Sequence, residues 1–301
     1  MAEFAAELTG LGKVVVCGVG LIGGSFALGL KAAGAVREVV ALGRSRAPLE
    51  EAVRLGVADR IAIDWAEAAQ DADLILLAMP VGQMPPVMAA LAPHLQPGTV
   101  VTDGGSTKAD VVVAARAAFG DKVSQFVPGH PIAGAEKSGV AAANAALYRG
   151  KRVVLTPLAE NAAGSVDRVA AAWQACGANI SQLAPAEHDG VFAAVSHLPH
   201  LLAYALVHEL AARDNANQLF GFAAGGFRDF TRIASSHPEM WRDICLANRK
   251  ALLKELDAYS AELLKTRLLL ASADGAGLEA MFATARARRD AWLDSLLPAG
   301  E

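Results

Sequence analysis

Residues 13–34, KVVVCGVGLIGGSFALGLKAAG, decide the fold of this 301-residue chain. An apolar run leads into a glycine-rich turn and then into a helical pattern, which is the order of elements in a dinucleotide-binding unit. Gly18 allows the tight turn, Gly20 lets the backbone approach a pyrophosphate, and Gly23 lets helix and strand pack closely. The helix N-terminus adds unpaired N–H groups. We therefore predict a dinucleotide site, rather than a purely structural turn, formed by Gly18, Gly20, Leu21, Ile22 and Gly23.

The same alternation of apolar runs and alanine-rich helical patterns continues for about 180 residues, which is typical of a parallel sheet with crossover helices. The runs are continuously apolar, as in strands buried on both faces. The predicted strands are residues 13–17, 38–42, 74–79, 99–102, 125–128, 152–156 and 179–183. This part of the chain is predicted to be α/β, a Rossmann-type, doubly wound and mostly parallel sheet.

The second predicted strand, residues 38–42, decides which dinucleotide fits. A strand in this position ends with Asp or Glu when the cofactor is NAD, because the carboxylate binds the ribose hydroxyls. Here Arg44, Ser45 and Arg46 follow the strand. Two guanidinium groups and a hydroxyl would bind a 2′-phosphate, which a carboxylate would repel. We predict NADP as cofactor, with NAD as the weaker alternative; the arginines could also be merely solvated loop residues.

After residue 187 the pattern becomes helical throughout. Residues 191–212 and 240–271 are long segments with apolar residues at helical spacing, and no strand pattern follows them. The chain is therefore predicted to divide into an NADP-binding domain, residues 1–187, and an all-helical substrate-binding and dimerisation domain, residues 188–301. The apolar stripe of residues 246–269 indicates either a core helix or a helix packed against a second subunit.

The composition excludes several other classes of protein. The chain is 53% hydrophobic, with 27 basic and 31 acidic residues and a net charge of −4, which excludes a disordered chain and argues against nucleic acid as a partner. The longest uncharged stretches, residues 14–30 and 74–102, are interrupted by glycine or proline, so no membrane partner is predicted. Three widely spaced cysteines fit neither a disulfide framework nor a metal site, and they favour a reducing cytoplasm.

A second group of small and polar residues follows two neighbouring predicted strands. DGGSTK occupies residues 103–108 and GHPIAGAEKSG occupies residues 129–139. Strand ends in an open α/β sheet line the crevice where cofactor and substrate meet. His130 lies between Gly129 and Pro131, which restrict its backbone, and an imidazole near its ordinary pKa is suited to accept a proton. His130 is therefore the catalytic candidate.

Five motifs together resemble the prephenate and arogenate dehydrogenases of tyrosine biosynthesis, the cyclohexadienyl dehydrogenases. They are GVGLIGGS, DGGSTK, GHPIAGAEKSG, SHLPH and GGFRDFTRIASSHPEMW, which follow one another between about residues 12 and 250. The resemblance implies oxidative decarboxylation of a small cyclohexadienyl acid, with hydride transfer to the nicotinamide, giving 4-hydroxyphenylpyruvate or tyrosine. It also implies a homodimer joined through the helical domains. Prephenate as a substrate is favoured, and the use of arogenate stays open.

The resemblance also implies roles for individual residues. His130 would bind the ring hydroxyl with help from Ser106, although Ser106 could instead be only the N-cap of the next helix. His200 would bind substrate, or alternatively cap or pack within its helix. Arg232 would bind a substrate carboxylate through its bidentate fork. Trp241 would contact the pocket, with an ordinary core position as the alternative.

Several acidic residues have less definite roles. In the same resemblance Glu136 pairs with arginine near the mouth of the site. Asp229 would either orient Arg232 or meet the substrate. The ammonium group of arogenate needs a carboxylate partner, for which Glu136, Asp229 and Asp243 are all candidates.

Two other functions compete with this interpretation. A β-hydroxyacid dehydrogenase or imine reductase of similar architecture is one, although the β-hydroxyacid enzymes use a lysine where this chain has His188, His197 and His200. A non-catalytic redox sensor that binds NADP is the other, and it would need none of the catalytic candidates. His197 itself is expected to be structural.

Overall fold

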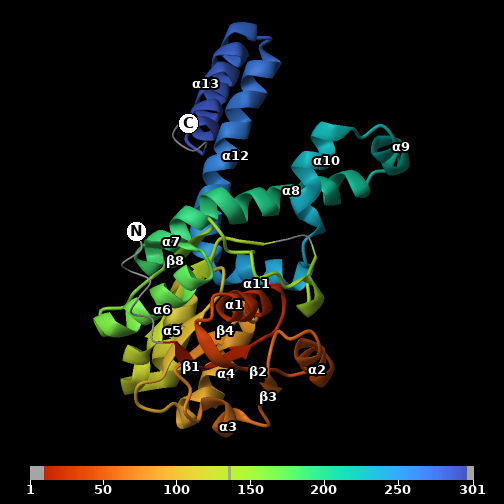
Figure 1. Cartoon of the computed structure of the whole chain (residues 1–301). Helices are drawn as coiled ribbons and strands as arrows, with labels where there is room; N and C mark the ends of the chain where they lie inside the picture. The colour runs from red at the N-terminus through yellow and green to blue at the C-terminus, as the bar shows by residue number, and fades with distance from the viewer. Residues whose placement is uncertain (1–9, 135–136, 297–301) are drawn as a thin grey trace. The chain divides into compact units, whose positions relative to one another are not determined.

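The computed structural model describes residues 10–134 and 137–296. The chain divides into two compact units, Met1–Ala251 and Leu252–Glu301, coloured red to cyan-blue and blue in Figure 1. The larger unit contains both sheets and most of the helices, so the predicted division at residue 187 falls inside it and stays a prediction.

The larger unit is built on a six-stranded parallel sheet with the order β3-β2-β1-β4-β5-β6. This is the strand order of a Rossmann fold, which confirms the predicted fold class. Its strands are β1 (Leu11–Cys17), β2 (Val36–Leu42), β3 (Arg60–Ile61), β4 (Leu74–Leu77), β5 (Val100–Asp103) and β6 (Phe126–Val127). Strand β3 was not predicted, because only two residues pair with β2. The order reverses between β1 and β4, and the carboxyl ends of these strands lie beside the glycine-rich turn.

Three further strands form a separate small sheet rather than extending the first. They are β7 (Gly129–Pro131), β8 (Arg152–Leu155) and β9 (Asn179–Gln182); β7 pairs antiparallel with β8, and β8 pairs parallel with β9. The last two were predicted, whereas β7 was not, since Gly-His-Pro has little strand propensity of its own. His130 stands opposite Val154 in this ladder, so its backbone is fixed by pairing.

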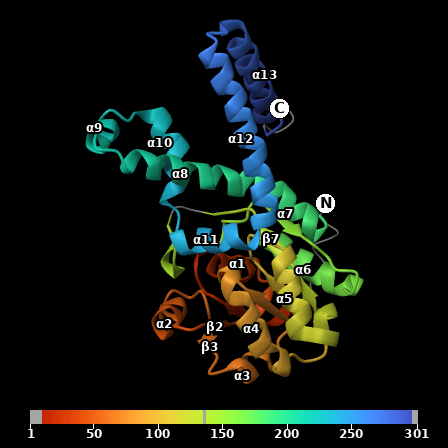
Figure 2. The same cartoon turned by 180° about the vertical axis from the view of Figure 1, so that it is seen from behind.

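Helices cover both faces of the large sheet (Figures 1 and 2). Alternate residues of β1 enter two different cores: Val14 and Val16 pack on one face, Val15 and Cys17 on the other. The first core is closed by α1 (Leu21–Ala32), α2 (Arg46–Arg54) and α6 (Ala163–Ala175), and the second by α3 (Trp65–Ala69), α4 (Met84–Leu91) and α5 (Ala109–Phe119). Burial on both faces explains why these strands are continuously apolar.

The described residues from 188 to 296 contain helices and no strand, as predicted. A nearly continuous helical run consists of α7 (Pro185–Phe192), a π-helical segment η6 (Ala193–His197) and α8 (Leu198–Ala211). It is followed by α9 (Ala216–Gly221), α10 (Gly225–Thr231), η7 (Arg232–Ser235) and α11 (Pro238–Ala247). By length and composition alone, Pro185–Ala211 is apolar enough to cross a membrane, a stretch that the inspection of uncharged segments missed. It carries His188, Asp189 and His200, which line the site described below.

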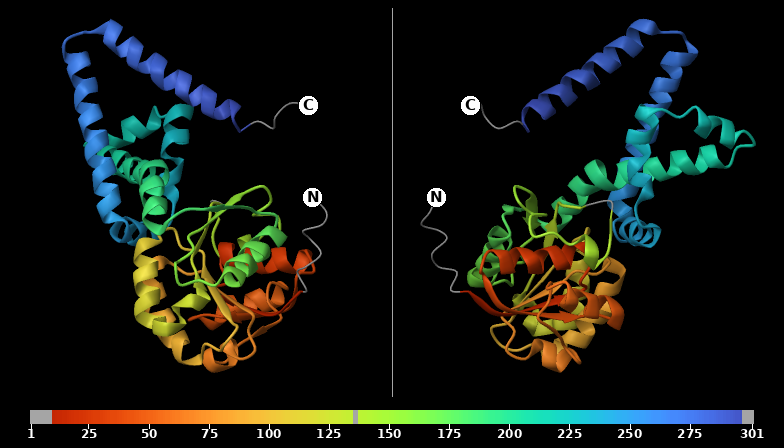
Figure 3. Two further views of the ribbon diagram at one scale, coloured as in Figure 1. Left: turned by 90° about the vertical axis from the view of Figure 1, so that its left-hand side faces the viewer. Right: turned by 45° about the vertical axis from the view of Figure 1, so that its right-hand side comes forward.

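The smaller unit consists of most of α12 (Arg249–Ala271) and of α13 (Gly275–Asp294), joined by a short turn (Figure 3). In α12 Leu252 is the buried residue. Leu256 and Leu269 are half-buried, and most other apolar side chains of the predicted stripe are exposed within this chain, among them Leu253, Leu263, Leu264 and Leu268. Within the described residues, the apolar stripe of α12 is therefore not buried as the stripe of an ordinary core helix would be.

Candidate functional site

The glycine-rich turn between β1 and α1 has the geometry that a pyrophosphate requires. Gly18 has φ +97°, and a Cβ there would lie 2.7 Å from the Ala78 carbonyl oxygen. A Cβ on Gly23 would collide with the Gly18 carbonyl oxygen, whereas a Cβ on Gly20 would meet nothing within 4 Å. Gly20 is the N-cap of α1 and supplies no side chain to its N–H groups. The turn is thus open where phosphates would lie, and its residues fit a dinucleotide.

Leu21 and Ile22 form the first turn of α1, where backbone N–H groups have no intrahelical acceptor. The Ile22 carbonyl accepts a hydrogen bond from the Tyr148 hydroxyl at 2.7 Å. The Ile22 side chain lies against Gly104, where an added Cβ would be 3.2 Å away. The cofactor turn therefore lies directly beside the DGGSTK motif.

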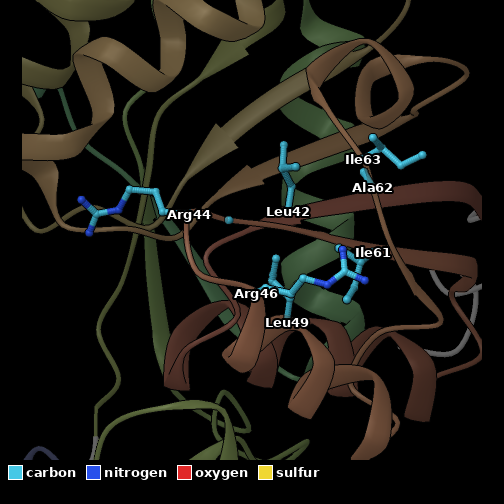
Figure 4. A pocket seen from close by; sticks show the side chains of 8 residues that line it. Leu42, Arg44, Arg46, Leu49, Ile61, Ala62 and Ile63 are labelled. Carbon is cyan, nitrogen blue, oxygen red and sulfur yellow. The ribbon is translucent and has the colours of Figure 1, made fainter.

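Arg44 and Arg46 line a cavity of about 280 Å³ at the ends of β2 and β3 (Figure 4). Its other lining residues are Leu42, Gly43, Leu49, Ile61, Ala62 and Ile63, with no carboxylate among them. Arg46 is paired with Glu50 on the next turn of α2, with Nε and Oε1 2.8 Å apart, whereas the Arg44 side chain extends away from it in Figure 4. Ser45 is the N-cap of α2, and its hydroxyl makes no capping hydrogen bond. Apolar walls and two cations at the rim suit a flat base and an attached anionic group.

His130 on β7 is joined to two residues that sequence reasoning did not place in the site. Its Nδ1 lies 2.8 Å from Nε2 of His188, and Nδ1 of His188 lies 2.8 Å from Oδ1 of Asp189. Both His188 and Asp189 belong to α7 and are buried. Phe192, one turn further along, packs its ring against both imidazoles, with centroid separations of 4.9 and 4.5 Å. The catalytic candidate is thus one end of a chain of hydrogen-bonding groups.

The DGGSTK motif fixes this arrangement through a buried ion pair. Lys108 Nζ donates to Asp103 Oδ2 and, at 2.7 Å, to the Gly129 carbonyl; both charged side chains are fully buried. Asp103 also accepts from the Gly105 and Gly129 N–H groups at 2.8 and 3.0 Å. Burial raises the pKa of Asp103, whereas Lys108 and the two backbone N–H groups oppose that rise, and these three donors favour the carboxylate form. The pair connects the end of β5 to the residue before His130, and so fixes the position of His130.

Burial lowers the pKa of the histidines in this cluster. The pKa of His130 lies well below its ordinary value near 6.5, chiefly because of burial and additionally because His188, Lys108 and His197 disfavour a further positive charge. Burial likewise lowers the pKa of His188, against the opposing effect of Asp189. At neutral pH His130 is therefore uncharged and able to accept a proton.

Ser106 lies in the half-buried loop between β5 and α5. The N-cap of α5 is Lys108, so the alternative in which Ser106 only caps that helix is wrong. The backbone of Ser106 lies beside His197. Burial lowers the pKa of His197 to about 4, although the Ser106 backbone has a smaller, opposite effect. His197 is buried between Asn248, 3.1 Å from its Nδ1, and the ring of Trp241, as expected for a structural histidine.

His200, Trp241 and Arg232 come together on three helical segments. The rings of His200 on α8 and Trp241 on α11 are stacked, with centroids 3.6 Å apart and planes 18° from parallel. His200 Nδ1 lies 2.9 Å from the Ser196 carbonyl, and its pKa is lowered by burial and by the nearby charge of Arg232. Trp241 is also buried in the second core, as the alternative of a core position predicted, and its contact with the pocket stays a prediction.

The acidic candidates are dispersed. Asp229 on α10 is exposed and lies 3.6 Å from the Arg228 guanidinium. Asp243 on α11 pairs with Arg242 at 2.7 Å and lies against Gly82. Glu136 lies outside the described residues. Within residues 10–134 and 137–296, no group of three or more His, Cys, Asp or Glu side chains is arranged so that it could hold a metal ion.

Two family models together match most of the chain. The one described as prephenate dehydrogenase, nucleotide-binding domain, matches residues 26–182, and the one described as prephenate dehydrogenase, dimerization domain, matches residues 184–284. A prephenate dehydrogenase of Bacillus subtilis (strain 168) is 37% identical over 279 residues, which are 92% of this chain and 75% of that protein. The chain belongs to the prephenate dehydrogenase family.

Other members of the prephenate dehydrogenase family extend this likeness. A cyclohexadienyl dehydrogenase of Zymomonas mobilis is 36% identical over 264 residues, 87% of this chain and 89% of that protein. The structure of Aquifex aeolicus prephenate dehydrogenase with hydroxyphenyl propionate and NAD+ has a TM-score of 0.86 at 34% identity, covering 93% and 98% of the two chains. Synechocystis arogenate dehydrogenase gives 0.79 at 29% identity, covering 93% and 99%. The family resemblance found in the five motifs is confirmed.

Proposed function

We propose that this protein catalyses the oxidative decarboxylation of prephenate, and of arogenate if its side-chain ammonium is accommodated. The observation that carries the proposal is the position of His130, fixed on β7 by the Asp103–Lys108 pair and followed by Pro131, which lies with Ile22 of the glycine-rich turn against Gly104. Two curated relatives are named prephenate dehydrogenase and cyclohexadienyl dehydrogenase, and the similar Aquifex structure contains NAD+. These likenesses do not favour a β-hydroxyacid dehydrogenase, an imine reductase or a redox sensor.

His130 has the central part in the reaction. A nicotinamide dinucleotide held by Gly18, Gly20 and Gly23 would supply the hydride acceptor. As hydride leaves the ring carbon that bears the hydroxyl, the O–H proton passes to His130 and the oxygen becomes a carbonyl. The bond from the ring to its carboxylate then breaks, CO₂ leaves, and the released electron pair makes the ring aromatic. As the ring becomes aromatic, the electron pair of the C=O bond comes to rest on the oxygen, which takes the proton back from His130 and becomes the phenol hydroxyl of the product.

Four residues are proposed to bind the substrate or to support the residues that do. Arg232, whose charge lies near His200, is proposed to bind a carboxylate of the substrate through its bidentate fork. His200 would contact the substrate while Trp241, stacked on its ring, fixes the ring plane. Ser106 would assist His130 from the loop after β5. Asp229, Glu136 and Asp243 remain the candidates for meeting the ammonium group of arogenate.

We propose NADP in preference to NAD. Arg44 and Arg46 at the rim of the cavity, together with the free hydroxyl of Ser45, would bind a 2′-phosphate, and no carboxylate lines the cavity to bind ribose hydroxyls. The match of residues 184–284 to a dimerization domain and the exposed apolar stripe of α12 support a homodimer through the helical part. A cytoplasmic location is proposed from the free state of Cys17, Cys176 and Cys245.

A spectrophotometric assay tests the function. The purified protein is mixed with NADP and either prephenate or arogenate, and the NADPH absorbance and released CO₂ are followed. Equal rates of NADPH and CO₂ formation from prephenate are expected. Binding of NADP without turnover of either substrate would contradict the proposal and favour a sensor.

A further inference from the structure

The chain of groups from His130 through His188 to Asp189 has a defined hydrogen-bond direction. Its three members are His130 on β7 and two residues of α7, and the side chains of His188 and Asp189 are 0% and 8% exposed. Water therefore contributes little to the hydrogen bonding of His188. Each bond in the chain must be satisfied by the groups that the structure places there.

The direction is set at the Asp189 end. Asp189 Oδ1 accepts the Lys108 backbone N–H at 2.8 Å, and Oδ2 accepts that of Ala109 at 2.8 Å. Although burial alone would raise the pKa of Asp189, the hydrogen bonds from His188 and these two amides lower it. A carboxylate only accepts, so the Nδ1 of His188, 2.8 Å from Oδ1, must carry hydrogen.

The same reasoning fixes the direction of the hydrogen bond between His188 and His130. Neutral His188 with hydrogen on Nδ1 has a lone pair on Nε2, which accepts a hydrogen bond from His130. His130 must therefore carry hydrogen on Nδ1, and its Nε2 is left as a lone pair. Without the carboxylate, either tautomer of both rings would satisfy the same distances.

We propose that His188 and Asp189 are positioning residues that fix the tautomer and ring orientation of His130, so that Nε2 is always the proton acceptor. The proposal deepens the proposed function, on which its kinetic part rests. Because Nδ1 of His130 is already protonated and bonded to His188, an incoming proton can only enter at Nε2. Phe192, packed against both rings, keeps their planes in place while the charge forms.

The first test is independent of activity. Protein labelled with ¹⁵N in histidine is examined by NMR near pH 7.5, with the His130 signals assigned from their loss in His130→Asn. We expect the chemical shifts of a ring protonated on Nδ1 in the wild type. A ring protonated on Nε2, or an averaged mixture of the two tautomers, would overturn the proposal even if the enzyme turns over prephenate.

The second test uses a matched pair of variants. In His188→Gln the amide oxygen can still accept from His130 Nδ1, whereas His188→Leu keeps similar bulk and offers no acceptor. We expect kcat to fall about 10- to 100-fold in His188→Leu and to stay within about fivefold of wild type in His188→Gln, with KM changed little in both. Thermal melting and NADP binding confirm folding. Unchanged kcat in His188→Leu, or equal loss in both variants, contradicts the proposal; if His188→Leu does not fold, the tautomer measurement decides.

Discussion

Lowering the pH from 8 to 5 is expected to destabilise this protein through His197, and the size of the effect follows from its burial. The ring is 1% exposed and its pKa is lowered to about 4, chiefly by burial, against an unfolded value near 6.5. Since the folded pKa is depressed, the unfolded chain binds the proton first. The stability is complete above about pH 6.5 and falls as the pH drops towards 4. At pH 5 the loss due to this one group is about 2 kcal/mol.

The measurement compares wild type with His197→Gln, whose amide oxygen can still accept from Asn248. Free energies of unfolding are obtained from urea titrations at pH 8 and pH 5, at fixed ionic strength and protein concentration. The charged or titratable groups near His197, namely Asp189, His188 and His200, are present in both proteins and cancel to first order. Wild type should lose about 2 kcal/mol more than the variant. The same loss in both proteins would refute the assignment of the acid sensitivity to His197.

Three further outcomes are expected. Arg44→Ala should lower kcat/KM for NADP about 10- to 100-fold and leave kcat/KM for NAD within about threefold. The control variant Arg54→Ala, at the other end of α2, should change neither value. An equal loss for NADP and NAD would contradict the assignment of Arg44 to the 2′-phosphate. The pKa of His130 is lowered by burial and by the nearby His188, Lys108 and His197. We therefore expect kcat/KM for prephenate to stay level as the pH falls below 6.5 and to decline only at lower pH. A midpoint at or above pH 6.5 would show that the pKa of His130 is not lowered or that His130 is not the base. Light scattering should give twice the mass of one chain, and a monomer mass would exclude the homodimer.

The parts of the fold and site that were predictable from sequence are those written in short local patterns. The glycine-rich turn is an example, since Gly18 adopts φ +97° and a Cβ on Gly23 would lie 2.2 Å from the carbonyl oxygen of Gly18 in the same turn. His130 was also identifiable, because it lies in a short motif of small and polar residues. In each case the requirement and the residue are close in sequence.

The hydrogen-bonded group formed by His130, His188 and Asp189 was not predictable, because its members and their partners are distant in sequence. His188 lies 58 residues from His130, and Asp189 lies 81 residues from the Lys108 amide that it binds. The adjacent His188 and Asp189 in α7 were the available signal, but the sequence pattern does not reveal which side chain they contact. Strand β7 was missed for a similar reason, since only its pairing with β8 makes Gly-His-Pro extended.

The most direct test of the account is the kcat of His130→Asn with saturating prephenate and NADP. Asn keeps a hydrogen-bonding group beside His188 but cannot take a proton. The account predicts that kcat falls by at least about 100-fold while KM for prephenate and the binding of NADP change little. A kcat near that of wild type would show that His130 does not accept the hydroxyl proton, and the proposed mechanism would be wrong.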